Sequence, residues 1–114
     1  MNKKAYSMIS LANKAGKLVS GEDAVRNSIR SGKVKLAIVA EDASDNTKKR
    51  FINSAAFYNT AIMTWGLKEE LGSCIGKNER SVLGITDDNF SKSLEEKLEL
   101  EGINKEKPGG DLLE

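Results

Sequence analysis

Residues 36–40 read Leu36-Ala37-Ile38-Val39-Ala40, a continuous apolar run that lies between basic residues and the acidic pair Glu41-Asp42. An apolar run of this length without polar alternation is typical of a strand that is buried on both faces of an α/β sheet. Two similar runs follow at residues 61–65 and 81–86. We therefore expect these three runs to be strands of one small sheet.

The segments between these runs have the spacing of helices. Apolar positions from Ala5 to Ala12 recur at helical intervals and predict a helix over residues 3–15 that is closed by Gly16. Residues 17–19 form a short extended piece, and Ser20 with Asp23 has the pattern of a capping box that opens a second helix ending at Gly32. Further helices are expected at residues 44–57, at residues 67–75 and from residue 87. This alternation predicts an α/β fold, a three-layer α/β/α sandwich.

Length and composition favour one domain. The chain has 114 residues, enough for a hydrophobic core without disulfides. We expect this domain to cover residues 1–101 and the polar, Gly- and Pro-containing residues 102–114 to form a flexible acidic tail. No apolar run approaches the roughly 18 residues of a membrane span, and no signal peptide is recognisable at the start. The single cysteine, Cys74, indicates the reducing cytoplasm.

The residue types that carry most catalysis are scarce. The chain has no histidine, so neither a zinc site with histidine ligands nor a Cys-His pair can form. The acidic pairs Glu41-Asp42 and Asp87-Asp88 are better explained by helix capping than as a metal or acid/base site. Asp42 or Ser44 is expected to cap the helix at residues 44–57, and Asp87 or Asp88 the last helix. Residues 72–77 lack the spacing of a phosphate loop, and Gly76 there is expected to cap a helix. We expect no enzyme activity, no cofactor, no metal and no small-molecule substrate.

Charge divides the chain into two parts. Residues 1–86 hold 14 Lys/Arg against 8 Asp/Glu, whereas residues 87–114 hold 4 against 9. A basic body suggests a surface for a polyanion, although ordinary solvated charge explains the count equally well. The basic residues between Lys14 and Lys33 stand near glycines that would let a phosphodiester backbone approach. The run Lys48-Lys49-Arg50 is better explained as a solvated helix face.

Two longer blocks carry a resemblance to a known family. Residues 11–21, Leu-Ala-Asn-Lys-Ala-Gly-Lys-Leu-Val-Ser-Gly, and residues 32–44, Gly-Lys-Val-Lys-Leu-Ala-Ile-Val-Ala-Glu-Asp-Ala-Ser, resemble the ribosomal-protein L-seven-Ae / L-thirty-e family. Leu71-Gly72, Ile75-Gly76 and residues 81–85 match later blocks of the same family, and the short bacterial, ribosomal-protein-like branch is the most similar. The resemblance covers about residues 3–100 and implies a mixed sheet and binding of kink-turn RNA.

The resemblance also implies where RNA binds. Family members use the start of the second helix, here Gly21 to Asn27, and the loop before the last strand, here Ile75 to Ser81. Together with the basic residues near the glycines, the candidate RNA-binding residues are Lys14, Gly16, Lys17, Gly21, Glu22, Asp23, Arg26, Asn27, Arg30, Lys33, Ile75, Gly76, Lys77 and Arg80. The expected partner is structured RNA, either ribosomal RNA or a kink-turn-like element, bound by a monomer in a ribosome-associated role.

One departure from the family pattern bears on specificity. Kink-turn binders of this family carry Asn-Glu-x-x-Lys inside the second helix, and the matching positions here are Asp23, Ala24 and Asn27. An ionised Asp23 cannot donate a hydrogen bond, and Ala24 offers no polar side chain. The sequence therefore predicts RNA binding with reduced kink-turn specificity. The alternative is a protein-interaction module on the same fold, with weak or lost RNA binding.

Overall fold

The computed structural model describes residues 3–107 of the chain. Within this range the chain alternates helices and strands. The elements are α1 (Lys3–Lys14), β1 (Leu18–Ser20), α2 (Glu22–Arg30), β2 (Leu36–Val39), α3 (Asp45–Phe57), β3 (Ala61–Thr64), α4 (Lys68–Ser73), β4 (Val82–Ile85) and α5 (Asp88–Glu99). The three expected strands and all the expected helices are present, and the extended piece after Gly16 is a short fourth strand. No helix within residues 3–107 has both the length and the apolar character to cross a membrane.

The four described strands form one mixed sheet in the order β1-β4-β2-β3. Strands β2 and β3 are parallel, while β4 runs antiparallel to both of its neighbours, β1 and β2. Strands β1, β2 and β3 therefore end where β4 begins. We call the end of the sheet at which β1, β2 and β3 finish and β4 begins the near end. The opposite end, at which β4 finishes, is the far end. Leu18 of β1 and Leu36 of β2 both pair with Ile85 at the far end.

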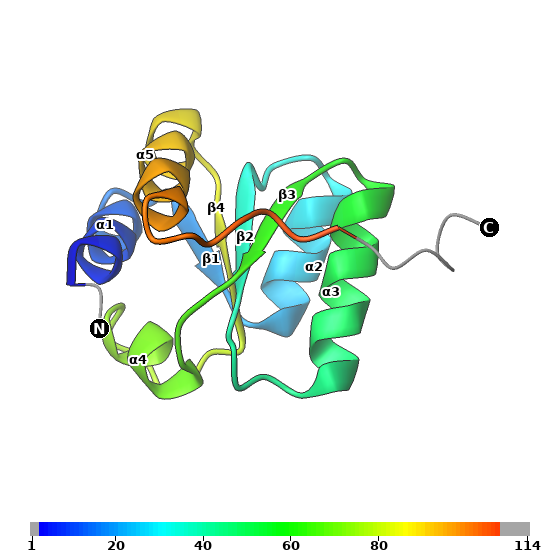
Figure 1. Ribbon diagram of the computed structural model, residues 1–114, viewed down its shortest axis with the longest axis horizontal. Helices are drawn as coiled ribbons and strands as arrows, with labels where there is room; N and C mark the ends of the chain where they lie inside the picture. The colour runs from blue at the N-terminus through cyan, green and yellow to red at the C-terminus, as the bar shows by residue number, and fades with distance from the viewer. Residues whose placement is uncertain (1–2, 108–114) are drawn as a thin grey trace.

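Helices cover both faces of the sheet, as the sequence predicted. In Figure 1, α1 and α5 lie on one face, α2 and α3 lie on the other, and α4 lies at the near end. Every residue of β2 and of β4 is buried, which confirms that these central strands have apolar neighbours on both faces. Leu94 and Leu98 of α5 are fully buried on one face of the sheet, and Val25 and Ile29 of α2 are fully buried on the other.

Two of the expected helix caps are confirmed and one is wrong. Ser44 accepts a hydrogen bond from the Thr47 N–H (3.1 Å), and Asp87 accepts one from the Phe90 N–H (2.9 Å). The N-cap of α2 is Gly21, with a φ of 93°, instead of Ser20. Ser20 is the last residue of β1, so its backbone is already in the sheet and its side chain points to the neighbouring loop.

The chain after α5 returns along the sheet instead of leaving it. Met63 of β3 pairs with Lys105 in an isolated antiparallel bridge, and the Glu106 N–H donates to the Ile62 carbonyl (2.7 Å). Ile103 is partly buried against the core, and Figure 1 shows this segment crossing in front of β3. Residues 103–106, which were expected to belong to the tail, therefore pair with β3, an edge strand of the described sheet. Residues 108–114 lie outside the described range.

Candidate nucleic-acid interface

The start of α2 is open at the near end of the sheet. Gly21 donates its N–H to the Val82 carbonyl (3.1 Å) and accepts from the Val25 N–H (3.0 Å), which places the first turn of α2 beside β4. Within residues 3–107, no side chain caps this helix. The free N–H groups of a first helical turn carry partial positive charge and favour anions.

Two carboxylates of this turn are held by arginines. Asp23 pairs with Arg26 at 2.9 Å, and its own side chain is 89% exposed. Glu22 pairs with Arg50 of α3, so this second pair links two helices that are separate in sequence. Exposed ion pairs contribute only about 0–1 kcal/mol to stability because water competes with them. Either arginine can therefore exchange its carboxylate for another anion at little cost.

The loop between α4 and β4, residues 74–81, packs beside the start of α2. The Arg80 guanidinium donates from Nε to the Ser20 hydroxyl (3.2 Å) and from Nη1 to the Glu79 carbonyl (2.9 Å). At the other end of the loop, the Lys77 N–H donates to the Gly72 carbonyl (2.9 Å). Arg80 thus ties the loop to the end of β1 and leaves Lys77 exposed beside it.

The acidic pair after β2 is structural. Glu41 accepts from the Gly66 N–H (3.1 Å), and Asp42 accepts from the Lys68 N–H (2.8 Å) at the start of α4. These bonds tie the loop after β2 to the loop after β3, so Asp42 serves α4 while Ser44 caps α3. In the part of the chain that the structure describes, no three Cys, Asp or Glu side chains are grouped as metal ligands.

The structure divides the predicted RNA-binding residues between the two ends of the sheet. Gly21, Glu22, Asp23, Arg26, Gly76, Lys77 and Arg80 lie at or beside the near end, and Asn27 lies exposed farther along α2. Gly16, Lys17, Arg30 and Lys33 lie at the far end. The basic residues between Lys14 and Lys33 therefore do not share one surface. The reason is that β1 leads from the far end to the near end, and α2 leads back over about 14 Å.

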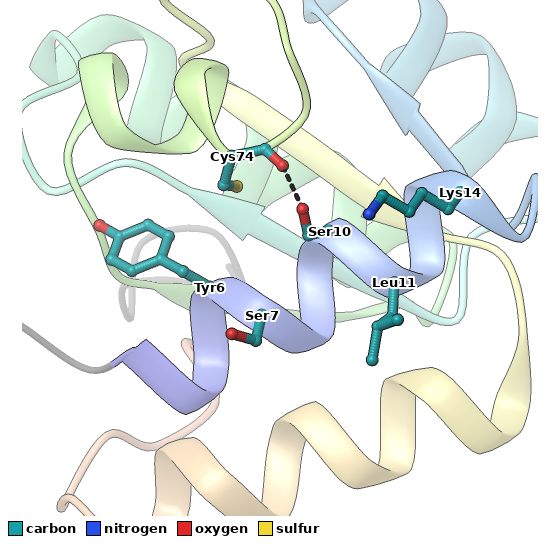
Figure 2. A pocket seen from close by; sticks show the side chains of 6 residues that line it. All are labelled: Tyr6, Ser7, Ser10, Leu11, Lys14 and Cys74. Atoms are coloured by element: carbon teal, nitrogen blue, oxygen red, sulfur yellow. Dashed lines mark hydrogen bonds between the residues drawn. The ribbon is translucent and has the colours of Figure 1, made fainter.

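The two remaining candidates, Ile75 and Lys14, have different surroundings. Ile75 is only 7% exposed and belongs to the core, so it supports the loop instead of offering a side chain to a ligand. Lys14 lines a cavity of about 430 Å³ between α1 and the end of α4, together with Ser10 and Cys74. Figure 2 shows the Lys14 amine on the same side of α1 as Ser10, whose hydroxyl donates to the Cys74 carbonyl.

The Cys74 thiol and the Tyr6 hydroxyl beside this cavity are both protonated at neutral pH. Burial raises the pKa of the Cys74 thiol to about 11, so the thiol stays protonated at neutral pH. Burial and the hydrogen bond to Glu70 (2.6 Å) raise the pKa of Tyr6 well above its usual value. The sequence-based interpretation of Cys74 as a packing residue agrees with these surroundings.

Arg50 is the near-end residue that sequence reasoning missed. It stands in the run Lys48-Lys49-Arg50, which resembles any solvated helix face. Its partner Glu22 lies 28 residues earlier in the chain, and the two side chains meet because α3 packs against α2. No local pattern signals a contact of this kind.

A family model and two relatives match most of the chain. The model of the ribosomal protein L7Ae/L30e/S12e/Gadd45 family matches residues 3–95. The chain is 40% identical over 96 residues to the RNA-binding protein YlxQ of Enterococcus faecium, covering 84% of this chain and 92% of that protein. It is 38% identical over 89 residues to the RNA-binding protein YlxQ of Bacillus subtilis (strain 168), covering 78% of this chain and 89% of that protein.

Two solved structures are also similar to this chain. A Bacillus halodurans protein of unknown function superposes with a TM-score of 0.78 at 35% identity, covering 82% of this chain and 94% of that chain. The Giardia lamblia 15.5kD RNA binding protein superposes with a TM-score of 0.70 at 17% identity, covering 88% and 89%, which shows a shared fold. The family model spans most of the domain, and the near-end elements fall within it. The chain belongs to the ribosomal protein L7Ae/L30e/S12e/Gadd45 family.

Proposed function

We propose that this protein is a non-catalytic, cytoplasmic binder of structured RNA, with ribosomal RNA or a kink-turn-like element as its target and a role on the ribosome. Membership of the family and the naming of two relatives as RNA-binding proteins support this proposal. The structural observation that carries the proposal is the arrangement of α2 and the loop before β4 at the near end. There the uncapped first turn of α2 and the loop before β4 lie side by side, joined by the Arg80–Ser20 hydrogen bond.

The near end offers the groups that structured RNA requires. Backbone N–H groups at the start of α2 can donate hydrogen bonds to phosphate oxygens or to acceptor atoms on base edges, and Gly21 has no side chain that would block them. Arg26 and Arg50 exchange their exposed carboxylates for phosphates when RNA approaches. Lys77 adds an exposed charge from the neighbouring loop. RNA is recognised in this way through shape, phosphates and splayed bases.

Specificity for kink-turns is expected to be lower than in family members that carry the full Asn-Glu-x-x-Lys pattern. Asp23 presents a carboxylate that is 89% exposed where the family pattern places an amide, and the exposed Ala24 offers no polar atom. A polar base edge left unpaired costs about 1–3 kcal/mol. The triple variant Asp23→Asn, Ala24→Glu and Asn27→Lys is therefore expected to bind a kink-turn RNA at least about tenfold more tightly, which corresponds to roughly 1.4 kcal/mol.

The test compares two RNAs at one fixed salt concentration, because Asn27→Lys adds charge and tightens binding to any RNA. The second RNA replaces the sheared G·A pairs of the first and is otherwise identical. The gain from the triple variant is expected on the kink-turn RNA alone. Nanomolar binding of the wild type to the kink-turn RNA, with loss of the altered RNA, would contradict the proposed reduction in specificity. Failure of the wild type to bind either RNA at low salt would contradict the function.

A protein-interaction module is the second candidate function, and one observation favours it. The first turn of α2 carries two carboxylates, Glu22 and Asp23, which repel phosphate unless their arginine partners remain close. Crosslinking in cells separates the two candidates. Recovery of RNA bonded to peptides from α2 or from the loop before β4 supports RNA binding. Recovery of protein crosslinks alone from these peptides supports the interaction module.

A further inference from the structure

A second basic surface lies at the far end of the sheet. Lys17, Lys33 and Lys35 are all exposed there, and Lys33 and Lys35 line a cavity of about 540 Å³. The Thr86 N–H donates to the Lys17 carbonyl (2.9 Å), and the Lys35 N–H donates to the Ile85 carbonyl (2.7 Å). Lys17 and Lys35 therefore flank the end of β4 on its two sides. With β4 between them, their backbones stand about 10 Å apart.

Among the residues that the structure describes, these lysines have no acidic partner, unlike the near-end arginines. Within residues 3–107, none of the ion pairs and none of the side-chain hydrogen bonds involves Lys17, Lys33 or Lys35. The acids that follow β4, Asp87 and Asp88, belong to the start of α5 on the opposite face of the sheet. Asp87 also uses its carboxylate to cap that helix.

The cavity between the lysines lies on the face that α2 covers. Its walls include Val19 of β1, Ser28 of α2 and Gly32 after α2. Gly32 has a φ of 75° and ends α2, so the chain turns there without a side chain over the opening. Arg30, exposed in the last turn of α2, adds a fourth cation beside this surface. The surface is thus a hollow with positive charge on its rim and a mainly apolar lining.

We propose that Lys17, Lys33 and Lys35 form a second RNA contact, which binds the phosphate backbone of the RNA whose structured element occupies the near end. This inference rests on the proposed function. The nine residues of α2 separate the two surfaces by about 14 Å, so the two surfaces contact different phosphates of the RNA. Lysines bind phosphate as point charges without reading the sequence. The far end therefore adds salt-dependent affinity that does not depend on RNA structure, and the near end supplies discrimination between RNA structures.

The test removes charge at the far end and at a matched control set. The far-end variant is Lys17→Gln, Lys33→Gln and Lys35→Gln, and the control is Lys4→Gln, Lys92→Gln and Lys107→Gln, which removes the same charge from exposed lysines elsewhere. The probes are a kink-turn RNA and a plain RNA duplex of equal length. Binding of each is measured over a range of salt concentrations, and melting curves confirm that each variant is folded.

The far-end variant is expected to flatten the slope of log K against log salt by about two for both RNAs, at about 0.7–0.9 for each lost phosphate contact. The preference for kink-turn over duplex should remain that of the wild type. The control is expected to change the slope by less than half as much. Equal slopes for the far-end variant and the control would overturn the proposal.

A near-end variant separates this proposal from the site proposed above. Arg80→Gln is expected to reduce the preference for the kink-turn RNA, because it releases the loop from Ser20, and to flatten the slope by no more than the roughly 0.7–0.9 of one phosphate contact. If Arg80→Gln has no effect while the far-end variant flattens the slope, the far-end contact stands and the near-end site is wrong. If the wild type binds neither RNA, both are overturned.

Discussion

Gly72 is the residue whose replacement tests the packing of the near-end loop most directly. It is a buried residue of α4 with an ordinary helical backbone, so alanine at this position meets no conformational strain. A Cβ atom built at Gly72 would lie 1.9 Å from the Asn78 carbonyl oxygen and 2.6 Å from its carbon. Restoring a normal contact at about 3.4 Å requires the loop to move by about 1.5 Å.

The change in the free energy of unfolding caused by Gly72→Ala combines a gain in helix propensity with losses from overpacking and weakened hydrogen bonds. In an open helix, alanine is favoured over glycine by about 0.8–1 kcal/mol. Here overpacking against backbone costs about 1–3 kcal/mol. Movement of the loop also weakens the Lys77-to-Gly72 (2.9 Å) and Arg80-to-Lys68 (3.0 Å) backbone hydrogen bonds, each contributing about 0.5–1.5 kcal/mol. The net destabilisation is about 2–3 kcal/mol, or a fall in Tm of about 10 °C for a domain of this size.

The assay is thermal melting followed by circular dichroism, with RNA binding measured well below both melting temperatures. The control is Ser73→Ala, an exposed neighbour in the same helix that adds no atom near the loop. We expect Ser73→Ala to melt within a degree or two of the wild type. Gly72→Ala should melt lower and lose kink-turn preference, because the displaced loop no longer lies against β1. A Gly72→Ala protein that melts at or above the wild-type temperature would refute the reasoning.

Three further predictions concern the rest of the domain. Asp87→Ala removes the cap of α5, so the free energy of unfolding should fall by about 0.5–2 kcal/mol in chemical denaturation, whereas Asp88→Ala should change it much less. Cys74 should react with iodoacetamide at pH 8 about 100-fold more slowly in the native than in the unfolded protein, because burial raises its pKa from 9.0 to about 11. Equal rates in the two states would show that the thiol is accessible to solvent in the native protein. Truncation after Gly102 should lower Tm, because it removes Ile103 and the backbone pairing with β3, and truncation after Lys107, which keeps both, is the matched control.

The local pattern of residues predicted the elements of this fold well. Apolar runs such as residues 36–40 can be satisfied only by burial on two faces, and the helical spacing in α1 and α5 leaves one apolar stripe each. These are properties of neighbouring residues, so they can be interpreted without knowing the rest of the chain. The cap at Ser20 was mispredicted because the same serine also fits the end of a strand, and pairing of β1 with β4 decided between the two.

The sequence by itself determined the helices, the strands, the family blocks and the positions of its candidate RNA-binding residues along the chain. Tertiary structure decided which of those residues share a surface. Lys17 and Gly21 are four residues apart, yet they lie at opposite ends of β1, because an extended strand carries the chain about 3.3 Å per residue. The Arg50–Glu22 pair and the docking of residues 103–106 on β3 join segments far apart in sequence. Such contacts depend on which strand edges and helix faces remain free after the core has packed. A local sequence pattern does not contain this information, because it depends on residues far apart in the chain.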